Sequence, residues 1–125
     1  NSSLIALNLR NNHIKINGTI AIAGALEVNS TLKSLGIGIN SIGDDGLMAI
    51  ADALKINLSL SSINLSGNQV GIHGINVLAG AIRINSVLTS LDLADNQIDH
   101  EGAIRIADAL MINSTLKSLN LETNK

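Results

Sequence analysis

The sequence predicts an α/β solenoid, a right-handed horseshoe with a parallel β-sheet on its concave side and α-helices on its convex side. The main observation is a leucine that recurs every 28 residues, at Leu4, Leu32, Leu60, Leu88 and Leu116. Each copy opens the pattern L-x-x-[LI]-x-[LI]-x-x-N, and the copies stay in phase. Apolar residues at helical spacing follow each copy, so each repeat is expected to supply one strand and one helix.

The period divides the 125 residues into repeats 1–28, 29–56, 57–84, 85–112 and a partial repeat, 113–125. No linker interrupts them, which indicates one domain spanning 1–125. A solenoid normally needs atypical polar repeats to shield its two ends, and neither end of this sequence has one. We therefore expect a fragment of a longer array.

The second repeat illustrates the predicted strand. Leu32, Leu35 and Ile37 alternate with small residues, so one set should face the core and the other should face outward. An asparagine ends each strand, where its amide can bond backbone groups that leave the sheet. We interpret this row as a structural ladder, formed by Asn12, Asn40, Asn68, Asn96 and Asn124.

The helix of the same repeat should bury Leu47, Ile50, Ala51 and Leu54, which follow the spacing of an amphipathic helix. Asp44-Asp45 precede them. Acidic side chains at this place can cap free N–H groups and interact favourably with the positive end of the helix dipole. We expect this pair to start the helix and interpret it as neither a carboxylate pair nor a metal site.

The composition restricts the function. A net charge of −2 with scattered Lys and Arg, and no aromatic residue for base stacking, argue against nucleic-acid binding. The absence of cysteine excludes disulfides and thiolate metal ligands, and no apolar run could span a membrane. His13, His73 and His100 fall at different repeat positions, and His100-Glu101 lacks the second histidine of a zinc helix. We expect no enzyme activity, cofactor, membrane contact or small-molecule substrate.

The segment Asn113–Asn124 resembles the strand segment of the ribonuclease-inhibitor class of leucine-rich repeats. Gly102-Ala103, followed by Ala107-Asp108-Ala109-Leu110, is similar to the helix of that class. The resemblance covers the whole chain and implies a cytoplasmic horseshoe that recognises proteins. Ribonuclease inhibitor, NOD-like receptors and Ran GTPase-activating proteins all use such repeats. Unlike ribonuclease inhibitor, this chain has one repeat length and neither cysteines nor aromatic residues.

The leading hypothesis is a non-catalytic protein-binding module from a larger cytoplasmic protein, such as a NOD-like receptor. The alternative that the resemblance implies is a segment of a Ran-type GTPase activator. A third possibility is a spacer without a ligand on this segment.

A partner on the concave face should meet the outward strand positions. Arg10 lies towards one end of this face, whereas Asp92, Asp95 and Glu122 make the other end acidic, which would suit a basic partner. The opposing interpretation is a solvated sheet, because interface hot spots favour Trp, Tyr and Arg. The predicted partner-binding residues are Asn8, Arg10, Asn64, Asp92, Asp95, Asn120 and Glu122.

A second surface lies on the convex side, where Ile20, Met48, Asn76 and Ile104 share a helix position expected to face solvent. Met111 lies two turns beyond Ile104. Exposed apolar rows can mark a contact surface. Sequence drift in a tolerant helix layer, or shielding between adjacent helices, would explain this row equally well.

Overall fold

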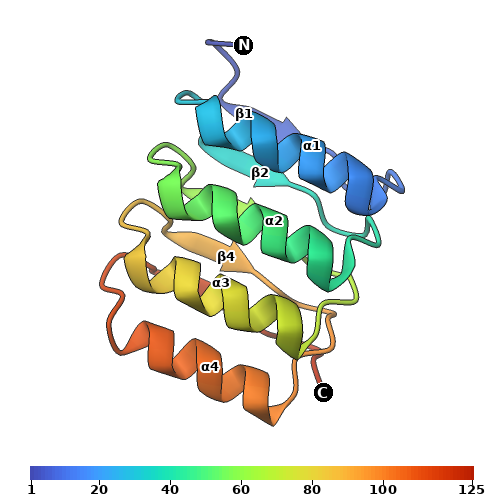
Figure 1. Ribbon diagram of the computed structural model, residues 1–125, viewed down its shortest axis with the longest axis vertical. Coiled ribbons are helices and arrows are strands. Elements are labelled where there is room, and N and C mark those ends of the chain that lie inside the picture. Colours follow the sequence, from blue (N-terminus) through green and yellow to red (C-terminus); the bar gives the residue numbers. More distant parts are fainter.

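The computed structural model describes residues 1–125 as one β-sheet covered on one face by a layer of helices (Figure 1). Strands and helices alternate along the chain, and each strand is three residues long. The strands are β1 (Ala6–Asn8), β2 (Ser34–Gly36), β3 (Ser62–Asn64), β4 (Ser90–Asp92) and β5 (Ser118–Asn120). The helices are α1 (Lys15–Val28), α2 (Gly43–Ile56), α3 (Ile72–Ile84) and α4 (His100–Leu110).

The strands pair in sequence order, β1 to β5, and every pair is parallel. Leu35 lies between Leu7 and Ile63, so the register follows the sequence period without a slip. Successive helices also pack against each other, α1 on α2, α2 on α3 and α3 on α4. These observations confirm the predicted α/β solenoid.

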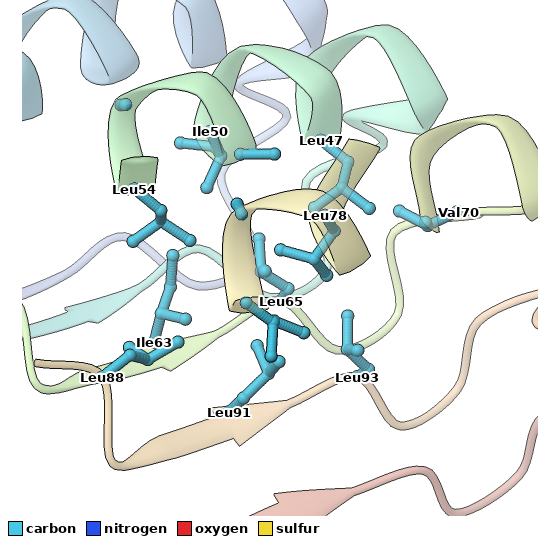
Figure 2. Close-up of a cluster of buried hydrophobic side chains, with 14 of the residues drawn as sticks. Leu47, Ile50, Leu54, Ile63, Leu65, Val70, Leu78, Leu88, Leu91 and Leu93 are labelled. Carbon is cyan, nitrogen blue, oxygen red and sulfur yellow. The ribbon is translucent and has the colours of Figure 1, made fainter. Parts of the chain in front are cut away.

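The core lies between the two layers and consists of aliphatic side chains and alanine. In Figure 2, Leu47, Ile50 and Leu54 of α2 lie above Ile63 and Leu65, which follow the path of β3. Ala51 and Ala53 are both fully buried. Their small side chains fit where the helix layer and its neighbours pack too closely for a larger residue. Stacked aliphatic side chains therefore form a closed core in the middle of the chain without any aromatic residue.

The end repeats bury less of their apolar surface than the middle repeats do. Ala79 is buried in α3, but its equivalent Ala107 is exposed, because α4 packs against a helix on one side only. At the other end, a hollow of about 310 Å³ opens between Leu4, Leu7 and Leu26. Stability is therefore expected to be greatest in the two middle repeats.

Asp44 and Asp45 lie in the first turn of α2, as expected, but neither caps it, since the N-cap residue is Ile42. The carboxylate of Asp44 instead accepts a hydrogen bond from the backbone N–H of Gly71, in the next repeat, at 2.7 Å. Asp99 does cap its own helix, α4, by accepting from the N–H of Gly102 at 3.0 Å. That hydrogen bond lowers the pKa of Asp99 below its ordinary value of 3.8.

A left-handed backbone position precedes the terminal asparagine of every repeat. Its φ angles are 59° at Asn11, 54° at Ile39, 66° at Gly67, 55° at Asp95 and 53° at Thr123. Only one of the five is glycine, although a side chain, and above all a β-branched one, is unfavourable in this conformation. Asn11, Gly67 and Asp95 tolerate this conformation, whereas at Ile39 and Thr123 the neighbouring repeats must impose it.

Candidate functional site on the outer face of the sheet

The register gathers the outward strand positions into three rows that run across the sheet. All four helices lie on the opposite face, so no element of the chain covers these rows (Figure 1). The first row is Ala6, Ser34, Ser62, Ser90 and Ser118; the second is Asn8, Gly36, Asn64, Asp92 and Asn120; the third is Arg10, Gly38, Ser66, Ala94 and Glu122.

The alternation predicts that the third row is open along its whole length, but most of this row is buried. Gly38, Ser66 and Ala94 are buried, and only the two end members, Arg10 and Glu122, are exposed. The Asn64 side chain accounts for part of this burial, since its Oδ1 accepts bonds from the N–H and the hydroxyl of Ser66. The middle of the face therefore presents two rows to a partner.

The second row combines structural and exposed polar groups. The side-chain oxygens of Asn8, Asp92 and Asn120 each accept the N–H two residues further on, as that of Asn64 does. The Nδ2 of Asn64 also donates to Oδ2 of Asp92. The amide nitrogens of Asn8 and Asn120 have no such partner, and Gly36 interrupts the row.

That interruption produces a hollow of about 350 Å³ over β1, β2 and β3. Gly36, Asn8, Arg10 and Asn64 are among the residues that line it. A Cβ at Gly36 would lie 3.0 Å from Oδ1 of Asn8, the flexible end of a side chain. The missing side chain thus creates a recess beside a guanidinium group, which can form a bidentate contact with a carboxylate.

The predicted charged residues lie at the two ends of the sheet. Arg10 is exposed next to β1, while Asp92 is half-buried on β4 and Glu122 is exposed after β5. Asp95 is exposed, but it lies on the left-handed turn beyond β4, where its backbone N–H donates to the carbonyl of Glu122. The outer face therefore carries a positive charge beside β1 and negative charges at β4 and after β5.

The asparagines at the ends of the strands bond the backbones of neighbouring repeats. Asn40 donates through Nδ2 to the carbonyls of Leu9, Ile37 and Gly38, and its Oδ1 accepts from Asn12 and Ile14. The other members of the row form equivalent contacts. We call Asn12, Asn40, Asn68, Asn96 and Asn124 the first asparagine ladder.

A second asparagine ladder, which the sequence reasoning missed, lies at the other end of the strands. Nδ2 of Asn57 donates to the carbonyls of Leu26 and Asn29, and its Oδ1 accepts from the N–H groups of Ser59 and Leu60. The same spacing of 28 residues would have revealed this row. Its members are Asn1, Asn29, Asn57, Asn85 and Asn113.

No group of three His, Asp or Glu side chains comes close enough together to hold a metal ion. Nor does any of the four helices have the length and apolar character needed to span a membrane.

Two solved structures have closely similar folds. A structure of leiomodin-1, described as actin-binding site 2, has a TM-score of 0.88 and 28% sequence identity, over 93% of this chain and 69% of its own. The tropomodulin C-terminal domain of Caenorhabditis elegans has a TM-score of 0.87, over 97% of this chain and 75% of its own. Its 11% identity supports the fold alone.

Comparison with curated protein sequences gives no significant match. The sequence model of the leucine-rich repeat matches residues 1–23, 28–51 and 85–107, which is more than half of the chain. The matched segments include β1, β2 and β4 and most of α1, α2 and α4. Together with the parallel sheet and its single helix layer, this match shows that the chain belongs to the leucine-rich repeat family.

Proposed function

We propose that the chain is a protein-binding module whose partner contacts the outer face of the sheet, and that actin is the first partner to test. The observation that carries the proposal is the outer face of the sheet, which no other element of the chain covers and which carries exposed polar and charged side chains. Actin is chosen because the similar leiomodin-1 structure is described as an actin-binding site. The resemblance to cytoplasmic proteins further suggests a cytoplasmic setting within a larger protein.

Recognition would rely on two features of this face. The recess at Gly36 accepts a projecting side chain, and the adjacent Arg10 supplies a cation for an acidic group of the partner. Asp92 and Glu122 at the other end would attract a basic group. Opposite charges at the two ends fix the orientation of a bound protein and steer its approach more than they add affinity.

Three substitutions to arginine test the location of the site. Gly36→Arg fills the recess, and Ser118→Arg adds the same side chain near the acidic end. Asn76→Arg is the matched control, because Asn76 is exposed on α3, on the opposite side of the molecule. Thermal melting of each variant checks that the fold is retained. We expect the two sheet variants to weaken binding at least tenfold and the control to leave it unchanged.

The assay is co-sedimentation with actin filaments, together with a titration of monomeric actin. Equal weakening by Asn76→Arg would place the contact elsewhere. Absence of binding to either form of actin would remove actin as the partner. The Ran-type alternative makes a different prediction, since a GTPase activator would accelerate GTP hydrolysis by Ran. We expect addition of the chain to leave that rate unchanged.

A further inference from the structure

An exposed row of aliphatic side chains runs along the edge where each helix leads into the next strand. These loops follow one another down the left side of Figure 1. Val28 is 85% exposed, Ile56 58%, Ile84 62% and Ile112 55%, and they stand at the same position of the four complete repeats. Leu58, 74% exposed, lies beside them. We call these five residues the aliphatic stripe.

The stripe has a recess that a side chain can enter. A hollow of about 200 Å³ lies between its first two steps, with Val28, Ile56 and Leu58 among the residues that line it. Strands lie ~4.8 Å apart and packed helices about 8–10 Å apart, so residues that connect the two layers have an intermediate spacing. That spacing is comparable with the pitch of an α-helix, about 5.4 Å. An aligned apolar row suggests a surface for a second apolar row.

The backbone along this edge is already hydrogen-bonded. Asn57 bonds the carbonyls of Leu26 and Asn29, and Asn85 bonds those of Leu54 and Asn57. The second asparagine ladder thus occupies carbonyl groups that an extended peptide lying along this edge could otherwise bond. The edge offers side chains only, which favours a partner whose own backbone is satisfied, as it is in a helix.

Basic residues flank the stripe. Lys55 and Arg83 directly precede Ile56 and Ile84 at the ends of their helices, and both are exposed. Lys33 and Lys117 are exposed on the sheet side, each at the residue just before a strand. Two acids lie on the helix side: Glu27, which directly precedes Val28 and lines the hollow, and Asp52, which pairs with Lys55 at 2.7 Å. The cations without such a partner are Arg83 on the helix side and Lys33 and Lys117 on the sheet side. Acidic groups on a partner would find cations on both sides.

We propose that the aliphatic stripe binds an amphipathic helix that carries acidic residues beside its apolar face. The partner's helix lies along the edge of the solenoid, and its large aliphatic side chains pack between successive residues of the stripe. A bilayer surface fits less well, because the stripe is narrow and the chain has no aromatic residue to anchor at a membrane interface. This site is separate from the outer face of the sheet, so a second protein can bind there independently.

The probe is a labelled, 18-residue synthetic helix with leucines along one face and glutamates beside them, titrated by fluorescence anisotropy against the full chain. The test variant is Ile56→Thr/Ile84→Thr, which keeps the β-branched shape and removes apolar surface. The matched control is Ile20→Thr/Ile104→Thr, on the exposed face of other helices, where these residues are 51% and 54% exposed. Arg83→Gln tests the contribution of charge, and thermal melting confirms that each variant folds.

The stripe variant should weaken binding at least tenfold and the control less than twofold. Arg83→Gln should weaken binding several-fold and reduce its salt dependence. A probe with lysines in place of glutamates should bind more weakly than the original. No saturable binding, or equal loss in the stripe and control variants, would overturn the proposal.

Two other occupants give distinct results, and either would overturn the proposal. If the stripe variant abolishes flotation with phosphatidylserine vesicles while the peptide does not bind, the surface contacts a membrane. If sedimentation shows a dimer that the stripe variant dissociates, and the peptide does not compete, a second copy of the chain occupies the stripe.

Discussion

The backbone N–H of Asn68 donates a hydrogen bond to Oδ1 of Asn96, 28 residues further along the chain, at 3.0 Å. Asn40 bonds Oδ1 of Asn68 in the same way, at 2.8 Å. Asn40 and Asn68 therefore each receive a bond from the repeat before, while their own N–H groups bond the repeat after. Because these groups are buried, the amides replace the water that would otherwise hydrate the turns.

Asn68→Ala should weaken folding more than Asn64→Ala. Asn68 is 0% exposed, and its loss leaves the N–H of Asn40 unsatisfied and removes one of two amide donors from each of the carbonyls of Ile37 and Leu65. One unsatisfied buried group costs about 1–3 kcal/mol and each lost hydrogen bond about 1 kcal/mol, so the loss should reach about 3 kcal/mol. Asn64 is half-buried at the sheet face and should cost about 1 kcal/mol or less. Equal shifts in urea unfolding would contradict this difference.

Asp44→Ala and Asp45→Ala form a second matched pair. Asp44 accepts the N–H of Gly71 across the repeat boundary, whereas Asp45 is exposed and has no hydrogen-bond partner in the chain. We expect a loss of about 1–2 kcal/mol for Asp44→Ala and less than about 0.5 kcal/mol for Asp45→Ala. If both acids act only through the dipole of α2, chemical denaturation will give the same small loss for each.

Ile39→Asn should stabilise the protein. Ile39 has a φ of 54° and is 43% exposed, so it combines an unfavourable backbone conformation with limited burial. Asparagine tolerates this conformation better and occupies the equivalent position at Asn11. We expect a gain of about 1 kcal/mol, measured by urea unfolding. Ile20→Asn, on an exposed helical position, is the control and should be slightly destabilising. A lower stability for Ile39→Asn would mean that the buried part of Ile39 outweighs the strain.

Asp99 should make stability depend on pH in the acid range. Its folded-state pKa is lowered, so the carboxylate contributes stability above the unfolded value of 3.8, and this contribution is lost as pH falls through the folded pKa. Asp99→Asn keeps a capping oxygen without the charge. Thermal melting of both proteins from pH 6 to pH 2 should show the advantage of the wild type shrinking towards low pH. Parallel curves would contradict the assignment.

The repeat pattern was sufficient to predict the core, since burial selects residue types directly. Leu47, Ile50 and Leu54 are buried as the helical spacing indicated, and Leu35 and Ile63 face the same core from the sheet. The sheet order follows as well, because consecutive repeats of equal length stack as neighbours.

Contacts between repeats were harder to predict. The bond from Gly71 to Asp44 depends on where the next turn lies in space, and the burial of Ser66 depends on how Asn64 folds over it. The convex row was only partly open, since Met48 is half-buried while Ile20 and Ile104 are exposed. The second asparagine ladder was visible as a spacing of 28 residues, but its bonds to the neighbouring loops depend on how the loops lie in space.

The two asparagine ladders have a consequence for how such a gene can change in length. Bonds from Asn57 reach back to Leu26 and Asn29, and those from Asn85 reach back to Leu54 and Asn57, so each link spans one or two repeat boundaries. Removing or duplicating a 28-residue unit would bring an equivalent donor to an equivalent acceptor. Recombination in whole repeats can therefore lengthen or shorten the array while every turn keeps its partners.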